Sequence, residues 1–145
     1  MAQLNFHKEN LNSYKQQKDI PIIAKLDAAY KLWHSYLIHL PKITRYTLGE
    51  KIDRLFTDCL ENALLASYRP RDKKMDLIEQ LNAKFDTLKF FIKLLWEIKE
   101  IDTNKLTELS VPLTEAGKMI GGWIKLLQPA IPETKTLPII SGERK

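Results

Sequence analysis

Cysteine and glycine are scarce in this chain, whose 145 residues include one cysteine and five glycines. The single Cys59 excludes an intramolecular disulfide and a cysteine metal cluster, and it favours a reducing compartment. So few glycines argue against long irregular stretches. Lysines interrupt every apolar run before it reaches the length of a membrane span, and residues 1–19 contain no apolar block of the secretory type. We therefore expect a cytoplasmic protein that does not enter a membrane.

The sequence motifs of common enzymes and metal sites are also missing. The chain has no GxSxG, no phosphate-binding glycine loop before a lysine and no HExxH. Di-iron bundles need Glu-x-x-His pairs, and none occurs. His34 and His39 are five residues apart, so they lie on different faces of a helix and cannot easily share a metal. The sequence predicts no catalytic residue, metal or cofactor, and a small enzyme with a site in its core is kept only as an alternative.

Apolar residues recur at alternating steps of three and four in residues 22–40, 48–66, 77–98 and 106–127. This spacing places them along one face of a helix. Helices joined by links as short as these run antiparallel to their neighbours. The pattern therefore predicts an all-α, up-down-up-down four-helix bundle over residues 21–128.

Prolines and capping residues mark the predicted helix boundaries. Pro21 suits a first helical turn, and later prolines end the apolar runs. Thr47 and Glu50 have the spacing of a capping box. Asp72 and Thr103 are expected to cap the third and fourth helices.

Two segments depart from the apolar pattern, and a proline lies inside one of the predicted helices. Residues 1–20 and 129–145 lack it, and we expect both to be flexible or to pack only on a partner. Pro112 lies inside the fourth apolar stripe. Because the stripe continues past this proline, we expect a kinked helix rather than two separate helices.

Two adjacent glycines, Gly121 and Gly122, lie inside the fourth stripe, where each costs about 0.8–1 kcal/mol relative to alanine. Close approach of another helix or of a neighbouring subunit would offset this cost, and Trp123 offers it an apolar surface. A frayed final turn is the alternative. The third helix also carries more apolar residues than one bundle core can absorb. The predicted subunit contacts are Phe90, Phe91, Leu94, Gly121, Gly122 and Trp123.

Positive charge is in modest excess, since 23 basic and 18 acidic residues give a net charge of +5. Such a balance favours a polyanionic partner. The residues that we predict to bind nucleic acid flank the second helix, and they are Lys42, Arg45, Arg69, Arg71, Lys73 and Lys74. Antiparallel topology places them at opposite ends of that helix, so they form two rims, although ordinary solvated turn residues are the alternative. The third helix also carries Lys84, Lys89, Lys93 and Lys99, which we interpret as part of a solvated face.

Residues 41–52, 88–98 and 115–125 together resemble the accessory variability determinant (Avd) family of diversity-generating retroelements. The resemblance implies a four-helix bundle that assembles into a ring of five subunits and carries a basic surface. It also implies a non-enzymatic partner of the reverse transcriptase that binds RNA, DNA or both and supports mutagenic reverse transcription and retrohoming. A related bundle family, encoded by intervening sequences in bacterial 23S rRNA genes, is the alternative. It implies a self-assembling structural protein without a catalytic role.

Overall fold

A computed structural model of the chain describes residues 2–128, except for the side chains of residues 2–7 and of Glu9. Every regular element among these residues is an α-helix. The helices are α1 (Ala2–Lys18), α2 (Pro21–Leu37), α3 (Lys42–Arg45), α4 (Leu48–Tyr68), α5 (Arg71–Glu97) and α6 (Thr103–Leu127).

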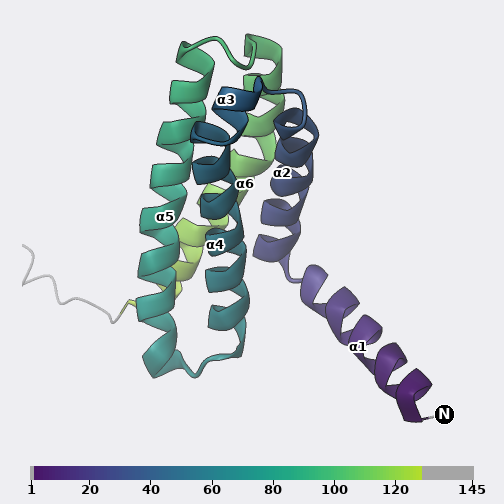
Figure 1. The fold of residues 1–145 in the computed structure, drawn as a ribbon. Coiled ribbons are helices and arrows are strands. Elements are labelled where there is room, and N and C mark those ends of the chain that lie inside the picture. Colours follow the sequence, from purple (N-terminus) through teal and green to yellow (C-terminus); the bar gives the residue numbers. More distant parts are fainter. Residues whose placement is uncertain (1, 129–145) are drawn as a thin grey trace, which may run out of the picture.

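Helices α2, α4, α5 and α6 form the bundle (Figure 1). Helix α4 packs along α5, α5 along α6, and α2 against both α4 and α6. The α4–α5 and α5–α6 links are short, and the longer α2–α4 link folds back through α3, so successive bundle helices run antiparallel. The all-α fold and the antiparallel packing predicted from the sequence are confirmed. The single-turn α3 lies in the link between α2 and α4.

The core is built from the predicted apolar stripes. Its largest fully buried side chains are Trp33, Phe56 and Phe85. The Trp33 and Phe56 rings stack with their centroids 6.1 Å apart, and the Trp33 indole donates a hydrogen bond of 3.2 Å to Asp53. Cys59 is completely buried in this core, and burial raises the pKa of its thiol to about 12. A thiol in such surroundings acts as a small hydrophobe.

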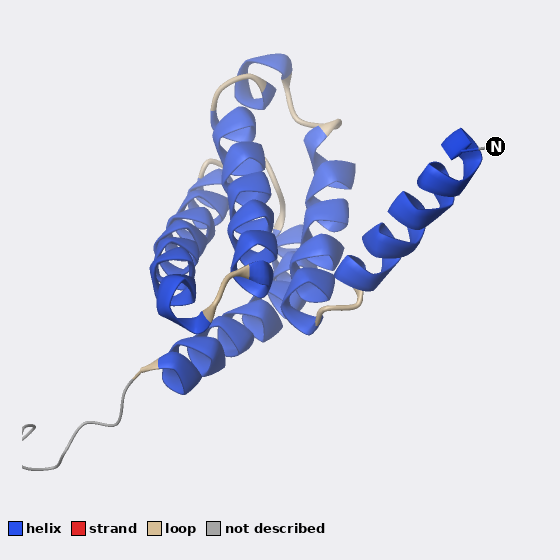
Figure 2. Cartoon of the chain, turned by 90° about the horizontal axis from the view of Figure 1, so that it is seen from below, coloured by secondary structure: helices blue, strands red, loops and turns tan. Residues whose placement is uncertain are grey.

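Helix α1 is not predicted by the apolar pattern. It extends away from the bundle in both views (Figures 1 and 2), and its described side chains between Lys8 and Gln16 are exposed. At its end, Gln17 is hydrogen-bonded to the Tyr68 hydroxyl and Lys18 forms an ion pair of 3.1 Å with Asp27. The flexibility expected for residues 1–20 stays a prediction. The tail expected at residues 129–145 lies outside the described residues.

The predicted capping box at the start of α4 is wrong. Instead of reaching forward to a backbone N–H, the Thr47 hydroxyl donates to the Ile43 carbonyl at 2.7 Å. This carbonyl belongs to the turn of α3, which ends two residues before Thr47 and which no pattern in the sequence predicted. Glu50 instead forms an ion pair of 3.2 Å with Arg54 along the exposed face of α4.

The other two predicted caps are also displaced, by two residues at α5, whose cap is Pro70, and by one residue at α6. Helix α5 begins at Arg71, so Asp72 lies inside its first turn. There its negative charge interacts favourably with the helix dipole. Helix α6 is capped by Asp102, whose carboxylate accepts a hydrogen bond of 2.8 Å from the Lys105 amide. Thr103, the predicted cap, instead accepts a hydrogen bond of 3.2 Å from the Trp96 indole. Aspartate is as good a cap as threonine or better, which explains the shift.

Helix α6 runs without interruption through Pro112 to Leu127, which confirms one helix and excludes a frayed turn at Gly121 and Gly122. Apart from its chain neighbours and the backbone of α6 itself, a Cβ atom at either glycine would meet no atom within 4 Å. Close approach by another described helix of the same chain is therefore the wrong explanation for them. The close approach occurs at Gly49, where a Cβ would lie 3.0 Å from Leu37 Cδ1.

Candidate nucleic-acid interface

Four of the predicted basic residues lie where the α4–α5 turn meets the end of α6. The Arg71 guanidinium donates a hydrogen bond of 3.0 Å to the Leu126 carbonyl, and Lys74 Nζ lies 5.7 Å from the centre of the Trp123 ring. We call this region the basic end, and its members are Arg69, Arg71, Lys73, Lys74 and Lys125. Asp72 and Asp76 are the carboxylates of the same turns, so the local charge is 5 − 2 = +3.

Aromatic side chains accompany this charge. Tyr68 is 57% exposed beside Arg69, and Trp123 is half-buried beneath Lys74. Exposed or half-exposed aromatic rings next to basic residues are suited to stacking on the bases of a single strand. A shallow apolar hollow also opens here, lined by Met119, Gly122, Trp123, Lys125 and Leu126.

The other two predicted residues, Lys42 and Arg45, lie on α3 at the opposite end of the bundle. Arg45 donates hydrogen bonds to the carbonyls of Ile38 at 3.2 Å and Leu40 at 2.9 Å, so its guanidinium closes the end of α2. Lys42 is exposed. The 21 residues of α4 separate this end from the basic end by about 30 Å. The structure therefore keeps the two predicted groups apart, and only one of them is dense in basic residues.

The predicted subunit contacts also separate into two patches. Phe90 is 63% exposed and meets the edge of Phe91 at 5.4 Å between ring centroids, with Leu94 one turn further along α5. The patch that contains Gly122 lies instead at the basic end. Lys74, which covers Trp123, precedes Phe90 by 16 residues of α5, or about 24 Å. The six residues do not form one continuous surface within the chain.

Comparison with known proteins decides the family. The model of a family described as bAvd-like matches residues 22–127, a span that covers α2 to α6 and omits α1. The chain belongs to the bAvd-like family. None of the curated proteins or solved structures compared with the chain matches it. Membership implies an accessory protein of a diversity-generating retroelement, and Avd-like proteins are generally non-catalytic.

The buried Tyr36 of this bAvd-like chain has a polar partner on α6. The Tyr36 hydroxyl donates a hydrogen bond of 2.6 Å to Glu108, and burial together with this bond raises the pKa of Tyr36. The described part of the chain holds no cluster of three or more metal-ligating side chains. None of its described helices is long and apolar enough to span a bilayer.

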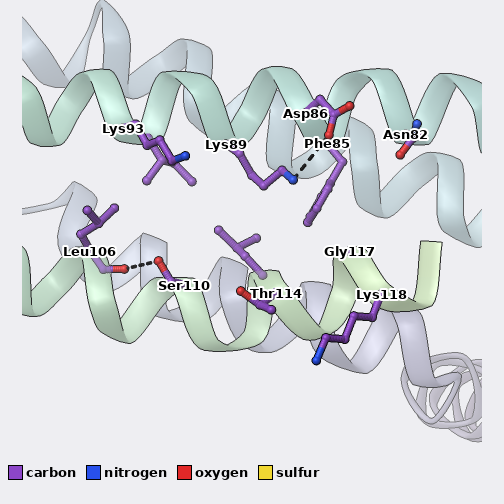
Figure 3. A pocket seen from close by; sticks show the side chains of 12 residues that line it. Asn82, Phe85, Asp86, Lys89, Lys93, Leu106, Ser110, Thr114, Gly117 and Lys118 are labelled. Carbon is purple, nitrogen blue, oxygen red and sulfur yellow. Dashed lines mark hydrogen bonds and ion pairs between the residues drawn. The ribbon is translucent and has the colours of Figure 1, made fainter. Parts of the chain in front are cut away.

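A groove between α5 and α6 was not predicted for this bAvd-like chain. It has a volume of about 530 Å³ and is bordered by Lys89 and Lys93 of α5 and by Lys118 of α6 (Figure 3). In the sequence, Lys89 and Lys93 alternate with acidic residues, which is typical of a solvated face. The groove could not be predicted from the sequence, because the sequence does not show which small residues of α6 pack opposite the lysines of α5.

Proposed function

We propose that this bAvd-like chain binds the reverse transcriptase of its retroelement and nucleic acid, either the template RNA or the complementary DNA. Holding both would support mutagenic reverse transcription and retrohoming without catalysis by the chain itself. The family match carries the accessory role. The basic end supports the nucleic-acid part of the proposal, because five basic residues converge there from the α4–α5 turn, the start of α5 and the end of α6.

The physical contribution is electrostatic attraction and proximity. Lysine and arginine side chains that meet phosphates release the counterions condensed on the strand, which favours binding at low salt. A protein that holds a strand and an enzyme together raises their effective concentration toward each other. Neither effect requires a reactive group.

Salt-dependent binding tests the nucleic-acid proposal. Fluorescence anisotropy of labelled single-stranded RNA or DNA should show affinity that falls steeply between about 50 and 200 mM salt. The double variant Arg69→Gln/Lys73→Gln should weaken binding and lower the salt dependence. Lys31→Gln/Lys84→Gln is the control of equal charge, because those lysines form ion pairs with Asp27 and Asp58. No binding even at low salt would instead favour the self-assembling structural protein.

The reverse-transcriptase proposal has a separate test. A reverse-transcriptase gene and a repeated variable region should lie beside the gene for this chain. Co-expression of the two proteins should give a complex that survives nuclease treatment and gel filtration. Elution of the two proteins as separate peaks after nuclease digestion would show that nucleic acid alone had joined them.

We further propose that the chain assembles into a ring of five subunits, as the family resemblance implies. The Phe90 patch and the Gly122 patch are different surfaces at different ends, and a contact between unlike surfaces of successive copies is the kind that closes into a ring. Gly122→Leu places a side chain on one of these surfaces and should abolish assembly, measured as solution mass by light scattering. Thr107→Leu, at an exposed position of α6 outside both patches, is the control. A Gly122→Leu variant of native mass would exclude this surface from assembly.

A further inference from the structure

The groove between α5 and α6 combines an apolar floor with a polar, basic rim. Phe85, Ile92 and Leu113 lie at its floor and are buried. Polar side chains from both helices line the groove, and Figure 3 shows Lys89 extending from α5 toward α6, whereas the ammonium group of Lys118 points away from α5 in this view. The rim residues are Asn82, Asp86, Lys89 and Lys93 on α5, and Ser110, Thr114 and Lys118 on α6.

Positive charge dominates the rim. Asp86 is the one carboxylate among the lining residues, and it forms an ion pair of 3.5 Å with Lys89. Lys93 and Lys118 form no ion pair with any residue that the structure describes. The rim therefore carries 3 − 1 = +2 charges and leaves two ammonium groups free for an anionic ligand.

The side of the groove formed by α6 carries only small side chains where it faces the lysines of α5. Gly117 has no side chain, and a Cβ there would lie 3.2 Å from the Phe85 ring. Ser110 and Thr114 are the next small side chains along the same wall. The groove runs from the level of Asn82 to that of Lys93, which is 11 residues of α5 or about 17 Å.

One end of the groove points toward the basic end. Lys118 and Lys125 are separated by two turns of α6, so they project from nearly the same side of that helix. Lys125 adjoins Leu126, whose carbonyl is bound by Arg71. Basic side chains thus continue from the α4–α5 turn along α6 into the groove.

The dimensions of the groove select the form of nucleic acid. A volume of about 530 Å³ over a length of about 17 Å gives a mean cross-section of about 31 Å², whereas the major groove of a duplex alone is about 12 Å wide, so a duplex cannot enter the groove. A single strand is narrow enough. Its phosphates would meet the lysines, its sugars and bases the apolar floor, and its polar edges the hydroxyls of Ser110 and Thr114.

We infer that the α5–α6 groove is a binding site for a single-stranded segment of RNA or DNA that continues from the basic end. This inference rests on the proposed nucleic-acid function and adds a second surface to it. Lys89, Lys93 and Lys118 bind phosphates of the strand.

Removal of groove charge gives the first test. The variant Lys89→Gln/Lys93→Gln should weaken binding of a labelled single-stranded oligouridine on the order of tenfold at low salt, and lower the salt slope by about 1.4. Lys31→Gln/Lys84→Gln removes the same charge elsewhere and should leave the slope unchanged. Equal slopes for the two variants would overturn the groove site.

Blocking the groove without changing charge gives the second test. Thr114→Trp fills the groove from an exposed position and should weaken single-strand binding at least several-fold, whereas Val111→Trp, an exposed position of α6 outside the lining, should not. Circular dichroism checks that both variants are folded. Native affinity of a folded Thr114→Trp would overturn the inference, and so would loss of assembly without loss of affinity, which would make the groove a subunit contact.

Competitors identify the ligand class. Unlabelled oligouridine should displace the probe from the groove, while inorganic triphosphate and polyglutamate at the same charge should displace it much less. Preferential displacement by triphosphate would assign the groove to free polyphosphates, and displacement by polyglutamate to an acidic protein. If wild type binds and only Arg69→Gln/Lys73→Gln weakens it, the groove inference fails alone. If wild type does not bind, the proposed nucleic-acid function fails.

Discussion

The Arg71 guanidinium lies against the last turn of α6, where it donates a hydrogen bond of 3.0 Å to the Leu126 carbonyl. This carbonyl is one of the four at a helix end that lack a partner within the helix. Arg71→Met keeps most of the side-chain length but removes the donor. The amides of residues 124–128 should then exchange faster with deuterium, with a global loss of no more than about 1 kcal/mol because the site is exposed. Arg69→Met should leave the exchange of these amides unchanged, and protection that persists in Arg71→Met would show that the bond does not hold α6.

Two glycines should respond in opposite ways to alanine. At Gly49 a Cβ would lie 3.0 Å from Leu37 Cδ1 and 3.1 Å from the Thr44 carbonyl, which is held by the Thr47 amide. Gly49→Ala should therefore lose about 1–2 kcal/mol of unfolding free energy in spite of the better helix propensity. Gly122→Ala meets no atom within 4 Å and should gain up to about 1 kcal/mol. Urea unfolding at low protein concentration measures the unfolding free energy of both variants. A Gly49→Ala variant more stable than the wild type would show that the α3 turn can shift to make room for the Cβ at little cost.

The start of α6 depends on Asp102. Asp102→Ala leaves the Lys105 amide without its side-chain acceptor and should lose about 1 kcal/mol of unfolding free energy. Asp102→Asn keeps an acceptor oxygen and should lose less. Thr103→Ala removes only the exposed contact with the Trp96 indole, which water can replace, so its loss should be smaller than that of Asp102→Ala. The reverse order in thermal or urea unfolding would restore Thr103 as the cap.

Alkaline conditions should destabilise the bundle. Burial, and then the hydrogen bond to Glu108, raise the pKa of Tyr36 above the ordinary value of 10.0. An unfolded tyrosine loses its proton near that value while the folded one keeps it, so unfolding releases a proton at higher pH. The unfolding free energy should be undiminished by this group below pH 10 and then fall by about 1 kcal/mol per pH unit. Tyr36→Phe should show a shallower fall, and identical slopes for variant and wild type would remove Tyr36 from the effect.

The bundle could be predicted from the sequence because its apolar spacing and its proline boundaries agree. Pro21, for example, occupies the first helical position of α2, where its missing N–H costs nothing. Helix α1 could not be found in this way, because its residues show no apolar stripe. The predicted caps were wrong for different reasons. At α6 both Asp102 and Thr103 could accept a backbone N–H, at α5 the cap is Pro70, which has no accepting side chain, and at α4 the unpredicted α3 supplies another partner for Thr47.

For the candidate site, the sequence predicted only which end of the bundle each basic residue occupies. Antiparallel order was enough to place Arg69 and Arg45 at opposite ends of the bundle. It could not show that the guanidiniums of Arg45 and Arg71 bind carbonyls at the ends of α2 and α6, because those contacts join residues whose approach depends on side-chain geometry. For the same reason Lys89 and Lys93 seemed part of an ordinary solvated face.

The burial of Cys59 has a practical consequence for labelling. The chain has no other cysteine, and the high pKa of this thiol keeps it protonated and unreactive near neutral pH. A cysteine introduced on the surface, at Thr114 in the groove or at Lys73 on the basic end, would be the only accessible thiol. Each copy could then carry a single spectroscopic probe without prior removal of the native residue.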